Sequence, residues 1–504
     1  MPTLIEALLH CPECFDHPVE NLRLVETHIS WVILTGAYAY KIKKPVNLGF
    51  LDFSTLEKRL HDCNEELWLN RRLAAGYYLD VVAITGSADS PRVNGEGVAI
   101  EYAVRMREFP ADATLDLLAE RGELKALQID LLAQRIAHFH LHECEVAKEG
   151  SPYGDPETIA RPVKDNFREL EALLVDASEK RSLEHLEHWC DEEHARLAPL
   201  MRKRSVRECH GDLHLANVAW VDAKPVIFDC LEFDPLLRWI DAISEVAFCF
   251  MDLLHRNHQG LAWRFINVWL SETGDYQGLA LLPYYAAYRA LVRAKVAGLG
   301  AAQGRPDASK EMTECLKLAI SFSKRRAPLL WITHGLSGSG KTTLTQALLE
   351  ERGMVRLRSD VERKRRAGLD ALARGNDALY SRQASLDTYE HLAELASGLL
   401  AAGFPVIVDA AFLERGQRER FRNLAKRMNA EFRILDLRVD PDVLRERVMS
   451  RHEEGKDASD AGLAVLERQL IGAQPLEEDE LVDTMPQGSC DDKAVNHGRL
   501  LQEI

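Results

Sequence analysis

The chain has 504 residues, more than one ordinary hydrophobic core supports, so two or three domains are expected. Its apolar fraction of 46% and charged fraction of 28% are those of a globular protein. The formal net charge of −16 argues against a protein that coats nucleic acid non-specifically. That charge suits a cationic or neutral substrate and leaves local basic sites for phosphate open.

No apolar run approaches the roughly 18 residues of a membrane-spanning helix, and the N-terminal stretch lacks the basic region and apolar core of a signal peptide. Ten cysteines are scattered along the chain, which is typical of a reduced, cytoplasmic protein. Cys11 and Cys14 form one C-x-x-C flanked by His10 and His17. Because no second matching pair follows, an ordinary N-terminal segment is favoured over a zinc site.

The N-terminal part predicts a small sheet followed by helices. Residues 22–53 contain two strand-like runs around a turn, and apolar and basic residues alternate in the second run. A helical pattern begins behind Ser54, the expected N-cap. More strands follow up to Phe109, and the chain is then largely helical to about Pro199.

Lysines on an early strand and glutamates on the next helix form a second signal. In kinase-type folds such a pair ties the nucleotide phosphates to the small lobe. Lys41 and Lys43 share one face of the predicted strand, and Glu65 and Glu66 lie in the predicted helix. Taken alone, residues of these types are more often solvated charges.

The stretch RECHGDLHLANVAW places Asp212 and Asn217 five residues apart, and the following apolar strand delivers Asp229 at its end. This is the spacing of a kinase catalytic loop followed by a metal-binding aspartate. Phosphoryl transfer to a hydroxyl needs a carboxylate near the attacking oxygen, here Asp212. It also needs oxygen ligands for Mg²⁺, here Asn217 and Asp229. The alternative is a polar loop between two strands.

The stretch ITHGLSGSGKTTL carries the P-loop pattern G-x-x-x-x-G-K-[ST], between an apolar run and a helix-permissive run. Its glycines let successive backbone N–H groups curl round a phosphate chain at a helix N-terminus. Lys341 is expected to reach the β- and γ-phosphates, and Thr342 offers a hydroxyl to Mg²⁺. The residues expected to bind a nucleoside triphosphate are Gly335, Ser337, Gly338, Ser339, Gly340, Lys341, Thr342 and Thr343.

From Pro328 onward, strands and helices alternate, which predicts an α/β domain. The run VIVD ends at Asp409, as a Walker B strand does, and its carboxylate is a candidate for holding Mg²⁺ or for capping. Arg447 and Arg451 lie four apart on one helix face. Their guanidinium groups are candidates for clamping a transferring phosphoryl group, with a solvated basic helix as the alternative.

The motifs HGDLHLAN and IFDCLEFD resemble the aminoglycoside phosphotransferase family, kinase-like enzymes that phosphorylate hydroxyls of antibiotics, sugars and other small molecules. The stretches YKIKKPVNLGFLDFS and NEELWLNRRLA resemble the small lobe of a bacterial branch that commonly carries a P-loop ATPase domain behind it. The likeness covers roughly residues 20–300, with only Gly36 at the strand turn where protein kinases have a glycine-rich loop. The resemblance implies that Asp212 is the catalytic base and that Asn217 and Asp229 are metal ligands. It also implies that Lys41 is the lysine that binds the phosphates and that Glu66 is its partner on the helix.

The C-terminal part, from about residue 328 to 480, resembles small P-loop kinases that include gluconate kinase, polynucleotide 5′-kinase and zeta-toxin-like enzymes. The resemblance makes Asp360, behind the second strand, the candidate base for an acceptor hydroxyl, and Arg363 a candidate substrate contact. It does not identify the acceptor, because acceptor loops vary freely on one scaffold. The matching segments are GLSGSGKTT, RSDVERK, VIVDAAF, the Arg447–Arg451 pair and the SDA of Ser459–Ala461.

The predicted architecture is an α+β bilobal protein-kinase-like domain (1–310), a linker helix (311–327) and an α/β P-loop NTPase domain with a mainly parallel sheet (328–504). The expected function is a bifunctional ATP-dependent phosphotransferase that uses Mg²⁺ and small-molecule hydroxyl acceptors. One alternative has a single catalytic site regulated by the other nucleotide site. Another is a nucleic-acid end-processing kinase. The acidic net charge of the chain disfavours this alternative, but the basic run at 362–368 keeps it open.

Overall fold

The computed structural model describes residues 3–49, 51–370, 373, 379, 381–454 and 462–487. Its contacts divide the chain into two compact units. None of the described helices is long and apolar enough to span a membrane. The first unit comprises Met1–Arg256 and Tyr284–Ile320, and the second comprises Asn257–Pro283 and Ser321–Ile504.

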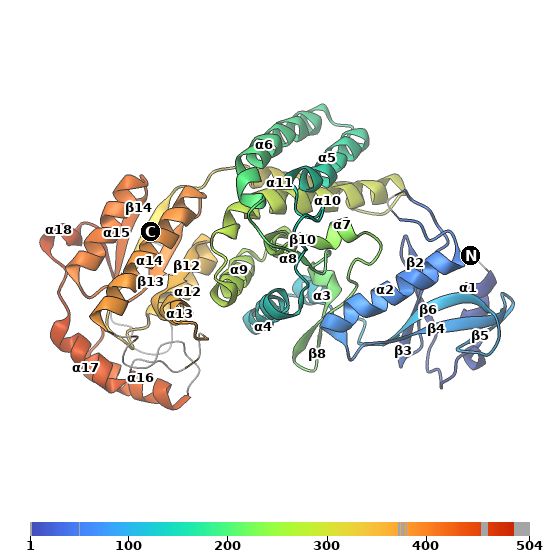
Figure 1. Cartoon of the computed structure of the whole chain (residues 1–504), viewed down its shortest axis with the longest axis horizontal. Coiled ribbons are helices and arrows are strands. Elements are labelled where there is room, and N and C mark those ends of the chain that lie inside the picture. The colour runs from blue at the N-terminus through green and yellow to red at the C-terminus, as the bar shows by residue number, and fades with distance from the viewer. Residues whose placement is uncertain are drawn as a thin grey trace. The chain divides into compact units, whose positions relative to one another are not determined.

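The N-terminal lobe of the first unit is an antiparallel six-stranded sheet in the order β1-β2-β3-β6-β4-β5. One face of the sheet packs with α1 (Thr3–Leu9) in a core that includes Tyr40 and Ile42. The opposite face carries Lys41 and Lys43, which reach α2 (Leu56–Ala74), as the period of two along a strand requires. Figure 1 shows α2 lying beside this sheet. The strands are β1 (Arg23–Glu26), β2 (Ser30–Leu34), β3 (Tyr38–Lys43), β4 (Tyr78–Ser87), β5 (Ser90–Val93) and β6 (Ala99–Arg107).

Helix α2 begins one residue later than predicted. Thr55 is its N-cap, and the Thr55 side chain accepts a hydrogen bond from the Lys58 backbone N–H. Ser54 instead donates its hydroxyl to Asp52 Oδ1 at 2.5 Å. Serine is in general the somewhat better N-cap, so capping preference does not explain the choice, and the contact with Asp52 accounts for Ser54 not capping the helix.

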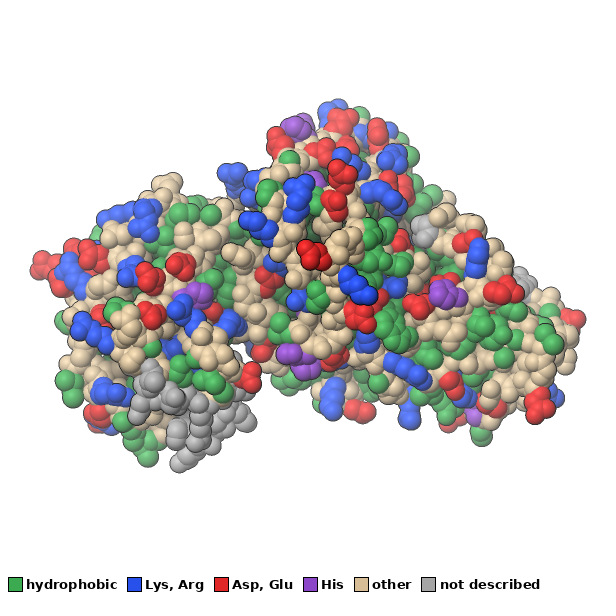
Figure 2. All heavy atoms as spheres, in the orientation of Figure 1, with side chains coloured by type: hydrophobic (Ala, Val, Ile, Leu, Met, Phe, Trp, Pro, Cys, Tyr) green, Lys and Arg blue, Asp and Glu red, His purple; other side chains and the backbone are tan. Residues whose placement is uncertain are grey.

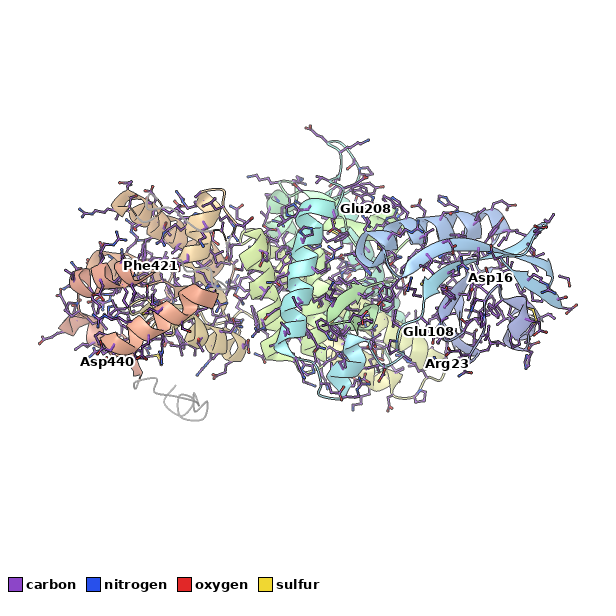
Figure 3. The ribbon with its side chains drawn as sticks, turned by 90° about the horizontal axis from the view of Figure 1, so that it is seen from below. Asp16, Arg23, Glu108, Glu208, Phe421 and Asp440 are labelled. Carbon is purple, nitrogen blue, oxygen red and sulfur yellow. A yellow bond between two sulfur atoms is a disulfide. The ribbon has the colours of Figure 1, made fainter. Side chains whose placement is uncertain are left out.

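The rest of the first unit is a helical lobe with two short β-ribbons, in which β7 pairs with β10 and β8 with β9. Figure 3 labels Glu208, which lies at the end of β7 in this lobe. The same figure labels Arg23 and Glu108 of the N-terminal lobe, whose ion pair (2.8 Å) joins β1 to the segment behind β6. The strands are β7 (Val206–Glu208), β8 (Val218–Val221), β9 (Lys224–Ile227) and β10 (Trp239–Asp241). The helices are α3 (Leu115–Glu120), α4 (Ala126–His138), α5 (Pro156–Leu173), α6 (Ala177–Met201), α7 (Pro235–Arg238), α8 (Ala242–His255), α10 (Leu282–Ala302) and α11 (Ala308–Ser321).

The second unit contains a parallel five-stranded sheet in the order β12-β13-β11-β14-β15. All residues of β13 are buried, and Figure 1 shows α14 and α15 beside β13 and β14. Phe421 of α15, labelled in Figure 3, packs edge-on against Phe412. The strands are β11 (Leu329–His334), β12 (Val355–Arg358), β13 (Val406–Asp409), β14 (Glu431–Leu437) and β15 (Thr484–Gln487). The helices are α12 (Lys341–Arg352), α13 (Ser359–Arg366), α14 (Arg382–Ala401), α15 (Arg415–Arg427), α16 (Pro441–Glu454), α17 (Leu463–Gly472) and α18 (Glu478–Leu481).

These two architectures confirm the predicted fold class: an antiparallel sheet with a helical lobe, and then a parallel α/β domain. Each of the two units is built from two separate stretches of the chain, whereas the predicted domains are the continuous ranges 1–310 and 328–504. The segment Asn257–Pro283, between α8 and α10, groups with the second unit. Most of the predicted linker helix corresponds to α11, which groups with the first unit as far as Ile320.

Helix α9 (Gln259–Thr273) shows why the inserted segment belongs to the second unit. The buried Asn267 amide donates to Met354 O at 2.9 Å and accepts from the Arg356 N–H at 2.7 Å. Arg264 adds an ion pair with Glu350 of α12 at 2.7 Å. These contacts join α9 to the start of β12 and to the helix that follows the P-loop.

The C-x-x-C pair does not meet the expectation of reduced cysteines. Cys11 and Cys14 form a disulfide across a short 3-10 helix. Sulfur atoms bonded to each other are not thiolate ligands, so the zinc alternative is not realised in this structure. The other cysteines among the described residues are free.

Candidate functional site

Helix α8 and the strand before it hold the backbone of the loop that carries Asp212. Glu245, which is fully buried, accepts hydrogen bonds from the backbone N–H groups of His210 (2.7 Å) and Gly211 (2.9 Å). Asp252, one turn from the end of α8, accepts the N–H of Leu215 at 2.9 Å. Buried carboxylates that accept backbone N–H groups fix a loop firmly, because an unmade bond there is costly.

Asp212 and Asn217, five residues apart in sequence, meet at the end of this loop. The Asn217 amide donates to the Asp212 backbone oxygen (2.9 Å) and to its Oδ2 (3.0 Å). His214 Nε2 lies 3.3 Å from the same Oδ2. Burial alone would favour the neutral forms, but the attraction between the two side chains lowers the pKa of Asp212 and raises the pKa of His214. Asp212 is therefore held as a carboxylate.

His210 connects this loop to the strand that leads to Asp229. The Asp212 N–H donates to His210 Nδ1 at 3.2 Å, so Nδ1 is the unprotonated nitrogen. The proton consequently lies on Nε2, which donates to Phe228 O at 2.8 Å. The histidine of the His-Gly-Asp motif thus has a structural role here.

Asp229 follows directly on this strand, with a backbone φ of +64°. Its Oδ1 lies 2.5 Å from Lys41 Nζ, which also contacts Glu66 Oε1 at 2.8 Å. Burial favours neutral Lys41, but the neighbouring carboxylates of Asp229 and Glu66 outweigh burial and raise its pKa well above the usual value. Lys43 reaches the other oxygen of Glu66 at 2.8 Å. The structure therefore brings both candidate lysines to one glutamate.

The residue pattern alone does not distinguish Glu65 from Glu66 as the partner of the lysines. Glu66 is fully buried and faces the lysines, whereas Glu65 Oε2 lies 3.6 Å from Arg238 Nη2. Glu232, which pairs with Lys43, and Glu245 were not singled out by sequence. Their only sequence signal is an acidic residue near each motif, which is too common to select them.

Near the loop that carries Asp212 lies a cluster of three buried residues, His140, Cys209 and Glu245. Their potential ligand atoms lie within 4.8 Å of one another. Burial, with a contribution from Arg207, lowers the pKa of His140 to about 3, so the imidazole is neutral. The Glu245 carboxylate already accepts two loop N–H groups, and Cys209 Sγ is 3.8 Å from Ile240 O. We interpret this cluster as support for the loop.

In the second unit, glycines shape the P-loop between β11 and α12. Gly338 and Gly340 have φ values of +86° and +90°, which side chains strongly disfavour. A Cβ on Gly335 would lie 2.8 Å from Ser339 Oγ and 3.0 Å from Leu437 O. The loop geometry therefore requires glycine at these motif positions.

Lys341, Thr342 and Asp409 come together at the carboxyl ends of β11 and β13. Thr342 Oγ1 donates to Asp409 Oδ2 at 2.9 Å, which links the Walker A hydroxyl to the end of the predicted Walker B strand. Lys341 Nζ donates to the backbone oxygens of Gly335 (3.1 Å) and Leu336 (2.8 Å). A hydroxyl beside a carboxylate is the oxygen pair that P-loop proteins offer to Mg²⁺.

Two other P-loop residues have distinct surroundings. The Ser337 N–H donates to Gln469 Oε1 of α17 at 2.9 Å, and Thr343 is exposed in the first turn of α12. Leu336 packs with the cluster formed by Leu444, Val448 and Leu466. Helices α16 and α17 therefore hold one side of the loop.

Asp360 lies in the first turn of α13, beyond the end of β12, with its Oδ1 3.0 Å from Arg363 Nη1. Arg447 is half-buried on α16. The Arg451 side chain and Ser459–Ala461 lie outside the described residues, so the predicted arginine pair stays a prediction.

The basic run 362–368 is not an exposed cationic strip. Lys364 is buried, and Arg363 and Arg365 make ion pairs with acidic residues of their own helix. Figure 2 shows acidic and basic side chains interspersed over the face that it draws. Arg366, by contrast, is exposed, so these contacts weaken the sequence signal for a nucleic-acid substrate without removing it.

The chain thus combines a unit with an antiparallel sheet and a helical lobe and a unit with a P-loop and a parallel sheet. Residues 330–476 match a family model described as an AAA domain, which confirms the predicted P-loop domain. Uncharacterized proteins of Mycobacterium tuberculosis (strain H37Rv) and Mycobacterium bovis are each 28% identical over 457 residues, spanning 88% of this chain and 90% of the relative.

Several solved structures are similar to parts of the chain. A gluconokinase from Sinorhizobium meliloti is 22% identical, with a TM-score of 0.24, over 33% of this chain and 86% of its own. The GDP complex of aminoglycoside 2′-phosphotransferase-IIIa is 14% identical, with a TM-score of 0.41, over 64% of this chain and 99% of its own. A choline kinase from Cryptosporidium parvum is 10% identical, with a TM-score of 0.40, over 69% of this chain and 99% of its own.

Proposed function

We propose that the chain is a bifunctional ATP-dependent phosphotransferase. Each unit transfers the γ-phosphate of ATP to a hydroxyl of a small molecule, with Mg²⁺. What supports this proposal is two separate sets of residues whose types suit phosphoryl transfer. The first set is Lys41, Glu66, Asp212, Asn217 and Asp229, and the second is Lys341, Thr342, Asp360 and Asp409.

In the first site, Asp212 is the base that orients and accepts the proton of the attacking hydroxyl. The Asn217 amide nitrogen is committed to Asp212, which leaves the amide oxygen for a metal ion. The Asp229 carboxylate has 45% of its side-chain surface exposed and supplies further oxygen ligands. When bound, Mg²⁺ neutralises charge on the triphosphate.

Lys41 is our choice for the lysine that binds the phosphates. Lys43 is almost fully buried, and both of its carboxylate partners are buried as well. Lys41 instead contacts the half-exposed Asp229, the candidate metal ligand. A lysine at that position can serve nucleotide and metal ligand together, while Glu66 holds its ammonium group.

In the second site, the P-loop backbone and Lys341 bind the phosphates, and Thr342 with Asp409 holds Mg²⁺. Asp360 is the proposed base, and Arg447 with Arg451 clamps the transferring group. A small-molecule acceptor is favoured because Lys364 is buried and Arg363 and Arg365 are ion-paired, although Arg366 of the same run is exposed.

The test uses full-length Asp212→Ala, Lys341→Ala and the double variant, each screened for ATP consumption against a library of hydroxyl metabolites. Two active sites predict that each single variant loses a different acceptor and that the double variant loses all turnover. If one substitution alone removes all turnover, the two-enzyme proposal fails. Salt-sensitive retention of a labelled oligonucleotide would revive the nucleic-acid alternative.

One observation favours the regulatory alternative as a second candidate. The segment Asn257–Pro283 packs within the P-loop unit, yet it joins α8 and α10. Those helices hold the Asp212 loop, through Glu245 on α8 and through Arg289 on α10, which donates to Gly211 O at 3.1 Å. Nucleotide binding at the P-loop would then change turnover at the first site, and a Lys341→Ala variant with unchanged first-site kinetics would exclude this candidate.

A further inference from the structure

Five charged side chains in the first site form an unbroken chain of alternating sign. Glu66 stands at its centre with no exposed surface, and each of its two oxygens faces a different lysine at 2.8 Å. Lys43, 1% exposed, then pairs with Glu232, 4% exposed. In order, the chain is Asp229, Lys41, Glu66, Lys43 and Glu232.

Burial explains why one lysine–glutamate pair does not suffice here. A buried carboxylate is stable only when both oxygens are satisfied, and a buried ammonium group needs its own counter-ion. Lys43 satisfies the second oxygen of Glu66, and Glu232 neutralises Lys43. The chain holds three carboxylates and two ammonium groups, and its end at Asp229 is exposed, with 45% of that side chain's surface accessible.

The inner ion pair also fixes the segment that carries Asp229. Glu232 lies three residues after Asp229, and its pair with Lys43 fastens this segment to β3. Between them, the Cys230 N–H donates to Asn70 Oδ1 of α2 at 2.9 Å. The backbone oxygen of Glu232 accepts from Arg238 Nη1 at 2.8 Å. The candidate metal ligand is thereby tied to the same strand and helix that position Lys41 and Glu66.

We propose that Lys43 and Glu232 are positioning residues of the first phosphotransfer site. They hold Glu66 and the Asp229 segment in register, so that Lys41 and Asp229 present their charges together. This inference rests on the proposed function of that site. Neither residue needs to touch nucleotide or acceptor, because both act through their buried neighbours.

The same lobe offers a matched control. Arg59 of α2 and Glu101 of β6 form another buried ion pair between this helix and the sheet, with Nε–Oε distances of 2.9 and 3.0 Å. Each residue is 7% exposed. Among the described residues, the side-chain hydrogen bonds of Arg59 go to Glu101 and to Phe53 O, and none goes to the charge chain. Arg59→Met therefore removes a buried ion pair between α2 and the sheet without removing a member of the charge chain.

The experiment uses the full-length chain in a Lys341→Ala background, which silences the second site. ATP turnover is measured against Mg²⁺ concentration, and thermal unfolding is recorded for each variant. Lys43→Met and Glu232→Gln are expected to lower kcat by about 10- to 100-fold, since misplacing a reacting group by about 1 Å costs about 100-fold. They are also expected to raise the Mg²⁺ concentration needed for half-maximal turnover, whereas Arg59→Met lowers only the unfolding temperature.

The inference is overturned if Lys43→Met and Glu232→Gln behave like Arg59→Met, with lower unfolding temperatures and an unchanged Mg²⁺ requirement. Should Lys43→Met fail to fold, the double variant Lys43→Met/Glu232→Leu replaces both charges with apolar groups. The same rise in Mg²⁺ requirement is then expected, and its absence overturns the inference.

Failure of the proposed function has a different signature. In the Lys341→Ala background, turnover that Asp229→Ala leaves unchanged would show that the first site does not catalyse the reaction. Calorimetric titration of Mg–ATP then decides the positioning role by itself. Weaker binding in Lys43→Met than in Arg59→Met supports it, and equal binding overturns it.

Discussion

Replacing Gly211 with alanine adds a single methyl group and should show whether the loop that carries Asp212 depends on its backbone geometry. It precedes Asp212 and has a φ of +88°. An added Cβ would lie 3.0 Å from Leu237 O and 3.3 Å from Arg238 Cα, both of which are backbone atoms. Because these neighbours cannot rotate away, Gly211→Ala must displace the loop itself.

The expected cost follows from two contributions. The left-handed conformation costs a non-glycine residue about 1–2 kcal/mol, and overpacking a tight site typically costs about 1–3 kcal/mol. Gly211→Ala should therefore lower the free energy of unfolding by about 2–5 kcal/mol. Gly150 has a φ of +79° with no atom within 4 Å of an added Cβ, so Gly150→Ala incurs the conformational cost alone.

Urea unfolding of both variants measures the difference, and ATP turnover in the Lys341→Ala background measures the catalytic effect. Contacts of 3.0–3.3 Å require a shift of a few tenths of an ångström, so Gly211→Ala should lower first-site turnover by less than the roughly 100-fold expected for a displacement of about 1 Å, while Gly150→Ala should leave it near the parent value. If the two alanine variants lose equal stability and Gly211→Ala retains turnover, the backbone crowding inferred at this loop is refuted.

Two further predictions concern His214 and Asn267. The pKa of His214 is raised in the folded protein by its pair with Asp212. This pair therefore contributes its full stabilisation below the pKa of an unfolded histidine, about 6.5. The stabilisation is lost as pH rises through the pKa that His214 has in the folded protein. His214→Gln should remove this decline in urea midpoint, and a midpoint that falls equally in both proteins would contradict it. Asn267→Leu leaves buried polar groups near Met354 unpaired, at about 1–3 kcal/mol each. It should destabilise the second unit in urea, whereas the exposed Asn64→Ala should change stability by less than about 0.5 kcal/mol. If Asn267→Leu loses no more stability than Asn64→Ala, the proposed contribution of the Asn267 hydrogen bonds is wrong.

The parts of the structure that sequence predicted best are local in the chain. The P-loop from Gly335 to Thr342 is one contiguous stretch whose glycines fix its shape, so its motif and its geometry are nearly the same information. Asp212 and Asn217 lie within one loop, and their hydrogen bond follows from that spacing. The alternation of strands and helices likewise predicted the parallel sheet of the second unit.

The parts that sequence could not predict depend on distant partners. Lys43 and Glu232 are 189 residues apart, and neither side chain shows by itself that the other will be buried beside it. The segment Asn257–Pro283 reads as one more amphipathic helical stretch, and only its contacts with Met354 and Arg356 assign it to the second unit. Choosing Thr55 over Ser54 as a cap required the side chain of Asp52.

The two sites should differ in how they tolerate substitutions. The phosphate-binding groups of the second site are backbone N–H groups and a hydroxyl within one short stretch, so substitutions that spare the P-loop and its supports at Asp409, α16 and α17 should leave its geometry intact. The first site is assembled by side chains from β3, α2 and the Asp229 segment through buried ion pairs. Breaking any one of these pairs leaves an uncompensated charge in the interior. Stability and catalysis are therefore coupled in the first unit, which is why matched controls such as Arg59→Met are needed to distinguish them.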